Sequence, residues 1–304
     1  MNSTEPDISW YTTQSTFTDP GTFAEWVAAL DPDPAALREV AAGLVFHFWG
    51  NGDITEHGFA PQRREEIDLR YAEDIFARLH DLNPAPLDAE RAPTERVVGC
   101  CRDFTLLFVA MARQHGIPAR SRTGFATYLM PGWAVDHTIA EVWDAGQRRW
   151  RLMDPQFPPG YQDPTDGAPL DVLDVPKDRF LVAADAWTRC RNGESDPARC
   201  VVSPDQPAPF LRGWPYLLHN LVLDLAALNK HEMILWDLWG PLDLSTEVAA
   251  ETITEMDTLS DLLRDPTTET DRIRKAFDDG ALRVPAMIHT ATPPAGVPRP
   301  ITLR

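Results

Sequence analysis

The sequence is short of positive charge. Its 304 residues include 28 Lys and Arg against 46 Asp and Glu, and the formal net charge is −18. A chain this acidic is not expected to bind nucleic acid or an anionic membrane through its overall charge. Hydrophobic residues nevertheless make up 43% of the chain, enough for a substantial core.

Long apolar runs are also missing. The most apolar region, residues 213–242, has its longest charge-free run between Arg212 and Asp224, far below the roughly 20 residues that span a bilayer. Residues 1–20 lack the basic and apolar regions of a signal peptide. We therefore expect no membrane association and a cytoplasmic location, where thiols stay reduced.

Cysteine is scarce, with four residues in the chain. Cys100 and Cys101 are adjacent, and Cys190 and Cys200 lie in a polar stretch that favours a structural or incidental role. Neither a disulfide framework nor the paired C-x-x-C spacing of a zinc site is present. A D-x-[DN]-x-[DN]-G calcium loop is absent too, so we predict no metal and no cofactor.

Helical patterns occupy the first 115 residues. Asp33 as N-cap and Pro34 at the first helical position predict a helix in "DPDPAALREVAAGLVFHFW". A four-residue spacing of apolar side chains predicts a second over 64–80. A third begins near Cys101 and ends at Gly116.

Strand patterns follow in "ARSRTGFATYL", "DHTIAEVW" and "RWRLMD". Residues 155–176 are rich in proline and predict a surface loop. Beyond them we expect a short helix over 177–190, one bent or two short helices over 213–240, acidic helices over 245–280 and an extended tail. Several polar residues lie among these later helices: Asp224, Asn229, Lys230, Glu232 and Asp237. They either dock the helices on the core or line a substrate cleft.

The start of the third helix is suited to a reactive thiol. Unpaired N–H groups and the positive end of the helix dipole lower the pKa of a cysteine there, and the same N–H groups can hold an oxyanion. A histidine and an orienting carboxylate would complete a nucleophile. If "DHTIAEVW" and "RWRLMD" form a hairpin centred between Ala145 and Gly146, His137 lies opposite Asp154; a longer loop would shift this pairing by one or two residues.

Three motifs together resemble the transglutaminase-like superfamily: "GCCRDFTLLFVAMARQHGIPAR", "DHTIAEVW" and "WRLMDPQ". The resemblance implies an α+β, papain-like fold with Cys101, His137 and Asp154 as catalytic triad. Cys101, not Cys100, occupies the nucleophile position because it stands two residues before Asp103. "GFATY" and "FLVAADAW" are also similar to uncharacterised bacterial proteins of this type.

The character of the sequence changes at about residue 177, so we predict a catalytic core over 1–176 and a mostly helical extension over 177–304. The reaction implied by the resemblance is attack of the thiolate on a peptide or small-molecule amide or acyl group, which forms a thioester that water or an amine resolves. Hydrolysis and acyl transfer both stay open, as do the oligomeric state and a non-enzymatic binding scaffold with a residual triad. For an oxyanion or substrate contact upstream of the nucleophile, the candidates are Tyr71, Trp49 and Asn51.

Overall fold

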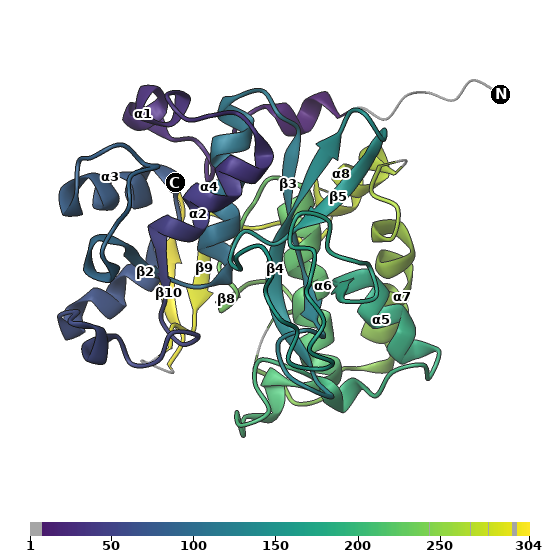
Figure 1. The fold of residues 1–304 in the computed structure, drawn as a ribbon. Helices are drawn as coiled ribbons and strands as arrows, with labels where there is room; N and C mark the ends of the chain where they lie inside the picture. The colour runs from purple at the N-terminus through teal and green to yellow at the C-terminus, as the bar shows by residue number, and fades with distance from the viewer. Residues whose placement is uncertain (1–7, 243, 268, 279, 294–296) are drawn as a thin grey trace.

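An antiparallel sheet forms the centre of the fold in this computed structural model, which describes residues 8–242, 244–267, 269–278, 280–293 and 297–304. Its strands run in the order β5 (Arg149–Met153), β4 (Ala134–Asp144), β3 (Ala119–Ala126) and β6 (Phe180–Val182). The short β7 (Cys200–Val201) pairs in parallel with the start of β4. Helices surround this sheet (Figure 1), and the fold is α+β as expected from the sequence.

The N-terminal lobe packs around one nearly buried helix, α4 (Cys101–Gln114). Around it lie α1 (Ala24–Ala28), α2 (Pro34–Leu44) and α3 (Ala72–Leu82). The predicted cap of α2 is confirmed: the Asp33 carboxylate accepts the Ala36 N–H at 3.3 Å. Gly116 follows α4 with φ +70°, which confirms it as the stop signal of that helix.

Two of the predicted helices are shorter than expected. α2 ends at Leu44, and Val45–His47 instead forms β1, which pairs in parallel with β2 (Val97–Gly99) just before α4. The helix predicted over 64–80 divides into a 3-10 helix, Pro61–Asp68, and α3, with Tyr71 extended as the N-cap between them. The apolar spacing over 64–80 marked side chains that are buried, but spacing alone cannot report a change of backbone conformation.

The C-terminal part continues the core sheet before it becomes helical. β6 and β7 both follow residue 176 and pair with β3 and β4, so the sheet crosses the domain boundary predicted there. The helices are α5 (Ala183–Arg191), α6 (Gly213–Leu228), α7 (Ala250–Leu263) and α8 (Thr270–Asp278). A second antiparallel sheet orders β10 (Arg299–Thr302), β9 (Met287–Thr290) and β8 (Asp237–Leu238). No helix in the described part is long and apolar enough to cross a membrane.

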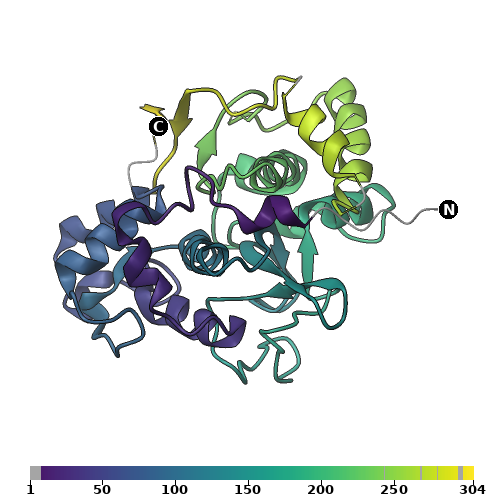
Figure 2. The ribbon, with the colours of Figure 1, turned by 90° about the horizontal axis from the view of Figure 1, so that it is seen from above.

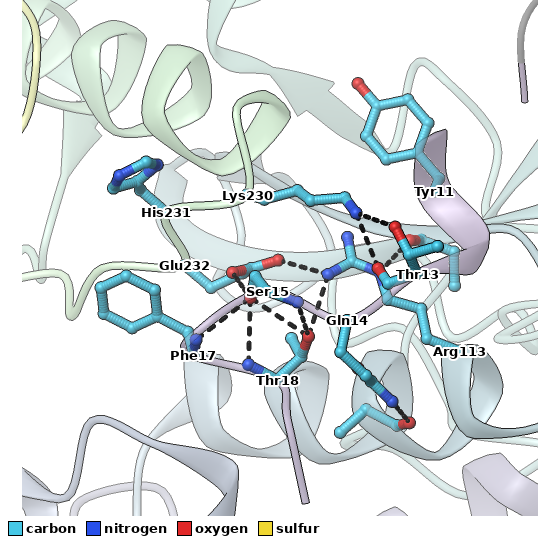
Figure 3. A network of polar contacts seen from close by, with 12 residues as sticks. Tyr11, Thr13, Gln14, Ser15, Phe17, Thr18, Arg113, Lys230, His231 and Glu232 are labelled. Carbon is cyan, nitrogen blue, oxygen red and sulfur yellow. Dashed lines mark hydrogen bonds and ion pairs between the residues drawn. The ribbon is translucent and has the colours of Figure 1, made fainter. Parts of the chain in front are cut away.

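Buried ion pairs hold the C-terminal helices on the core. Arg122 of β3 makes a two-pronged contact with Asp224 of α6, with N–O distances of 3.0 and 2.9 Å. Arg113 of α4 donates to Glu232 at 2.9 Å, and that carboxylate also accepts the Ser15 hydroxyl (Figure 3). Of the polar residues left open by the sequence, Asp224, Lys230, Glu232 and Asp237 bind other elements, whereas Asn229 donates to the Leu225 carbonyl of its own helix. The cavity described below is lined by other side chains.

The N-terminal segment runs between α4 and the end of α6 (Figures 2 and 3). Gln14 donates to the carbonyl of Ala110 in α4 at 2.9 Å, and the Tyr11 hydroxyl donates to the carbonyl of Leu228 at 3.0 Å. Lys230 donates to the carbonyl of Thr13 at 2.7 Å. The segment thus joins the nucleophile helix to the C-terminal helices.

Candidate functional site

The first turn of α4 is fixed by a glycine and an aspartate. The Asp103 carboxylate folds back to accept the Cys100 N–H at 2.8 Å. A Cβ on Gly99 would lie 2.6 Å from that carboxylate, so only glycine leaves room for it. Arg102 binds the other Asp103 oxygen at 3.0 Å and donates to the Glu232 carbonyl at 3.0 Å. The spacing of "GCCRDF" therefore builds the turn that presents Cys101.

His137 and Asp154 form a buried pair. His137 Nε2 lies 2.8 Å from Asp154 Oδ2. The same oxygen accepts the Tyr128 hydroxyl at 2.6 Å, and Oδ1 accepts the Gln156 N–H at 2.9 Å. Three hydrogen bonds satisfy this fully buried carboxylate, which holds the imidazole in one orientation.

The hairpin register predicted for this pair was wrong by two residues. β4 and β5 are joined by the longer loop 145–148, closed by Arg148 at φ +52°, and Asp154 lies one residue beyond β5. There the chain turns away, with the Asp154 N–H bonded to the Val172 carbonyl at 2.9 Å. The carboxylate reaches His137 because it has left the ladder, not because it pairs directly across it.

Cys101 meets this pair through the second ring nitrogen of His137. Since Nε2 is bonded to Asp154, Nδ1 is the nitrogen left to interact with the sulfur, and the interaction with His137 lowers the pKa of Cys101. Burial alone would lower the pKa of His137, but the Asp154 charge and the contacts with Asp154 and Cys101 outweigh it and raise that pKa to about 10. An imidazolium beside the sulfur favours the thiolate.

The two adjacent cysteines have opposite properties. A hydrogen bond from Cys100, followed by those from His137 and His47, lowers the pKa of Cys101 far below the usual thiol value despite burial. The bond to Cys101, together with burial, raises the pKa of Cys100 well above that value. The lower pKa of Cys101 favours it over Cys100 as the thiolate.

His47 is a contact of the sulfur that the sequence did not reveal. Its Nδ1 accepts the N–H groups of Trp49 at 3.2 Å and Gly50 at 2.9 Å, so Nδ1 carries no proton. The proton of this neutral ring must be on Nε2, the nitrogen left to donate to Cys101. A helix predicted to run on to Trp49 conceals a histidine at the end of a strand; the β-branched and aromatic residues of "VFHF" before "WGNG" are the available signal.

The residues predicted as oxyanion or substrate contacts fall in different places. Trp49 is 50% exposed and lines the cavity next to Cys101, so it stays a candidate for substrate contact. Asn51 also lines the cavity, but its carboxamide oxygen accepts the His47 N–H at 2.9 Å. Tyr71 lies elsewhere: its ring stacks on Phe17, and its hydroxyl accepts the Arg304 N–H at 2.8 Å. This placement argues against Tyr71 as an oxyanion partner.

An open cavity of about 1610 Å³ adjoins the nucleophile. Cys101, His47 and His137 lie in its wall, although Cys101 as a whole is only 5% exposed. The cavity runs from the loop that follows β1 to the segment before α7, and its other walls are largely apolar. Substrate access to a buried sulfur is therefore provided by the cavity. In the described part of the chain, no group of three or more acidic, histidine or cysteine side chains could hold a metal ion.

Comparison with known proteins supports the resemblance to the transglutaminase-like superfamily. Residues 63–155 match the family model of the transglutaminase-like superfamily, which confirms the resemblance noted from the motifs; Cys101, His137 and Asp154 all lie in this segment. A solved structure described as "a Putative Cysteine Protease" from Cytophaga hutchinsonii has 18% identity and a TM-score of 0.36, over 60% of this chain and 50% of that chain. The chain thus spans half the length of that protein. No match was found among curated proteins.

Proposed function

We propose that this protein is a cysteine-dependent enzyme that acts on an amide or acyl group through a thioester on Cys101. The observation that carries the proposal is the His137–Asp154 pair, 2.8 Å apart, with His137 and Cys101 in the wall of one cavity that is large enough for a substrate. The superfamily match supports thiol-dependent chemistry in general. The choice of Cys101, His137 and Asp154 as the catalytic residues rests on the geometry.

In the first step the Cys101 thiolate attacks the carbonyl carbon, and the carbonyl oxygen becomes an oxyanion. The backbone N–H of Cys101 has no intrahelical acceptor at the first position of α4, and the Nε2–H of His47 lies beside the sulfur. These two donors stabilise the oxyanion. Collapse of the intermediate breaks the bond to the leaving nitrogen or oxygen, which takes the proton of His137.

In the second step water or an amine attacks the thioester. His137, now neutral and still held by Asp154, takes the proton of the attacking group, and the thiolate leaves. With water the outcome is hydrolysis, and with an amine it is acyl transfer. Product analysis by mass spectrometry, with and without an added primary amine, separates the two.

Alkylation with iodoacetamide at pH 7, followed by peptide mapping, tests the proposal. Cys200 is the internal control because it is 2% exposed against 5% for Cys101, and its hydrogen bond to Cys190 and its burial raise its pKa. We expect Cys101 to react at least about a hundredfold faster, since only a thiolate is nucleophilic and its pKa is depressed. A His137→Ala variant should lose this preference. Equal and slow labelling of both cysteines would instead favour a binding scaffold with a residual triad.

A further inference from the structure

The cavity next to Cys101 is apolar over most of its wall. Phe48 and Trp236 pack edge-to-face at 6.1 Å on one part of it, and Phe157 and Tyr161 lie at 4.3 Å on another. Leucine, valine and proline side chains supply most of the remainder. A ligand that fills such a space gains affinity from buried apolar surface.

Charged side chains in this wall are few, and most are already paired or exposed. Asp53 faces Arg64 at 3.6 Å, Arg96 donates to a backbone carbonyl at 3.1 Å, and Glu247 is exposed. Asp136 differs from all of them. It lies next to His137 in β4, is half-buried, and forms no ion pair within the described residues.

Tyr216 is the partner of Asp136. The Tyr216 hydroxyl donates to Asp136 Oδ2 at 2.5 Å, and its ring stacks on His219 at 5.7 Å. No described residue donates a hydrogen bond to Oδ1. Burial and the negative charge of Cys101 raise the pKa of Asp136 to about 8, although Tyr216 and His137 act in the opposite sense. A carboxyl group in this situation is stabilised as the anion by an incoming cation.

We propose that the substrate of Cys101 is a small amphipathic molecule, with an apolar group in the cavity and a basic nitrogen held by Asp136 beside Tyr216. The inference rests on the proposed function, because the nitrogen must lie near the bond that Cys101 attacks. Asp136 and Cys101 line the same cavity, and Asp136 directly precedes His137 in β4, so a nitrogen at Asp136 shares the space next to the sulfur. Recognition of a cation also agrees with the chain's net charge of −18.

Ligand binding by a Cys101→Ala variant tests the inference without catalysis. Octylamine and octan-1-ol share the apolar chain and differ in charge, and binding of either raises the melting temperature. We expect both to bind, and octylamine to bind about tenfold tighter, as a hydrogen bond between charged groups allows. Adding Asp136→Asn should remove the difference between the two ligands. Adding Asp88→Asn, which changes an exposed carboxylate outside the cavity, should preserve it.

Alkylation of the wild-type protein tests the same inference at the nucleophile. The rate at Cys101 should rise by up to about fourfold per added methylene in a series of N-alkyl iodoacetamides, from the free energy of burying each group. N-(2-aminoethyl)iodoacetamide should outpace its hydroxyethyl analogue, and Asp136→Asn should remove that preference. Rapid alkylation that depends on neither chain nor charge would overturn this inference and leave the proposed function intact. Failure of iodoacetamide itself to label Cys101 would refute the function.

Discussion

Replacing His47 should separate two kinds of chemistry at Cys101. Its Nε2–H contacts the sulfur, while the Trp49 and Gly50 N–H groups fix the tautomer. In the resting protein this bond is one of several that favour the thiolate. During acylation the same N–H can move to the oxyanion, where a preorganised donor contributes more than it does in the ground state.

The expected magnitudes differ between two probes. Iodoacetamide is displaced at a saturated carbon and forms no oxyanion, so His47→Ala should slow its reaction by about tenfold, the low end of the cost of one hydrogen bond to a charged group. Acylation by p-nitrophenyl acetate passes through an oxyanion, and loss of one donor there costs about a hundredfold or more. The ratio of the two losses isolates the oxyanion contribution.

Stopped-flow release of p-nitrophenol and mass-spectrometric alkylation rates provide both values on the same variants. His47→Gln retains an N–H donor and should recover part of the acylation rate. His289→Ala, an exposed histidine of β9 outside the cavity, is the matched control and should change neither rate. Equal losses in both reactions of His47→Ala would refute the oxyanion role and leave His47 as a contact of the thiolate alone.

Three further predictions concern the pair and the sheet. The rate of Cys101 alkylation should be nearly flat from pH 6 to about 8, because the imidazolium of His137 is lost only above its pKa of about 10. An ordinary thiol with a pKa of about 8.5 gains roughly tenfold per pH unit in that range. A tenfold rise per pH unit at Cys101 would contradict the prediction of a preformed thiolate. Asp154→Asn removes the charge that raises the His137 pKa, so alkylation at pH 6 should fall by about tenfold or more, and an unchanged rate would exclude its orienting role. Gly124→Ala places a Cβ 2.1 Å from the Leu181 carbonyl oxygen of β6 and should lower the free energy of unfolding in urea by about 2 kcal/mol or more. Gly43→Ala in α2 has open space around it and should raise that free energy by about 0.5–1 kcal/mol. Equal effects of the two substitutions would contradict the packing argument.

The sequence by itself determined the parts of the protein that depend on neighbouring residues. The cap at Asp33, the apolar face of α4 and its end at Gly116 follow from local spacing, and all three are present. The motif "GCCRDF" identified which cysteine begins the helix, because Asp103 must reach back over Gly99. The α+β class followed from the resemblance of three motifs to the transglutaminase-like superfamily.

Only the tertiary structure decided how distant segments meet. A hairpin loop two residues longer than the shortest choice changed the β4–β5 register, yet the departure of the chain after β5 still brought Asp154 to His137. His47 reaches Cys101 because β1 pairs with β2, a contact between residues far apart in the chain. The periodicity of apolar residues shows which face of an element is buried, but it does not show which other element covers that face. Packing between elements sets the depth of the cavity, the partner of Asp136 and the tautomer of His47.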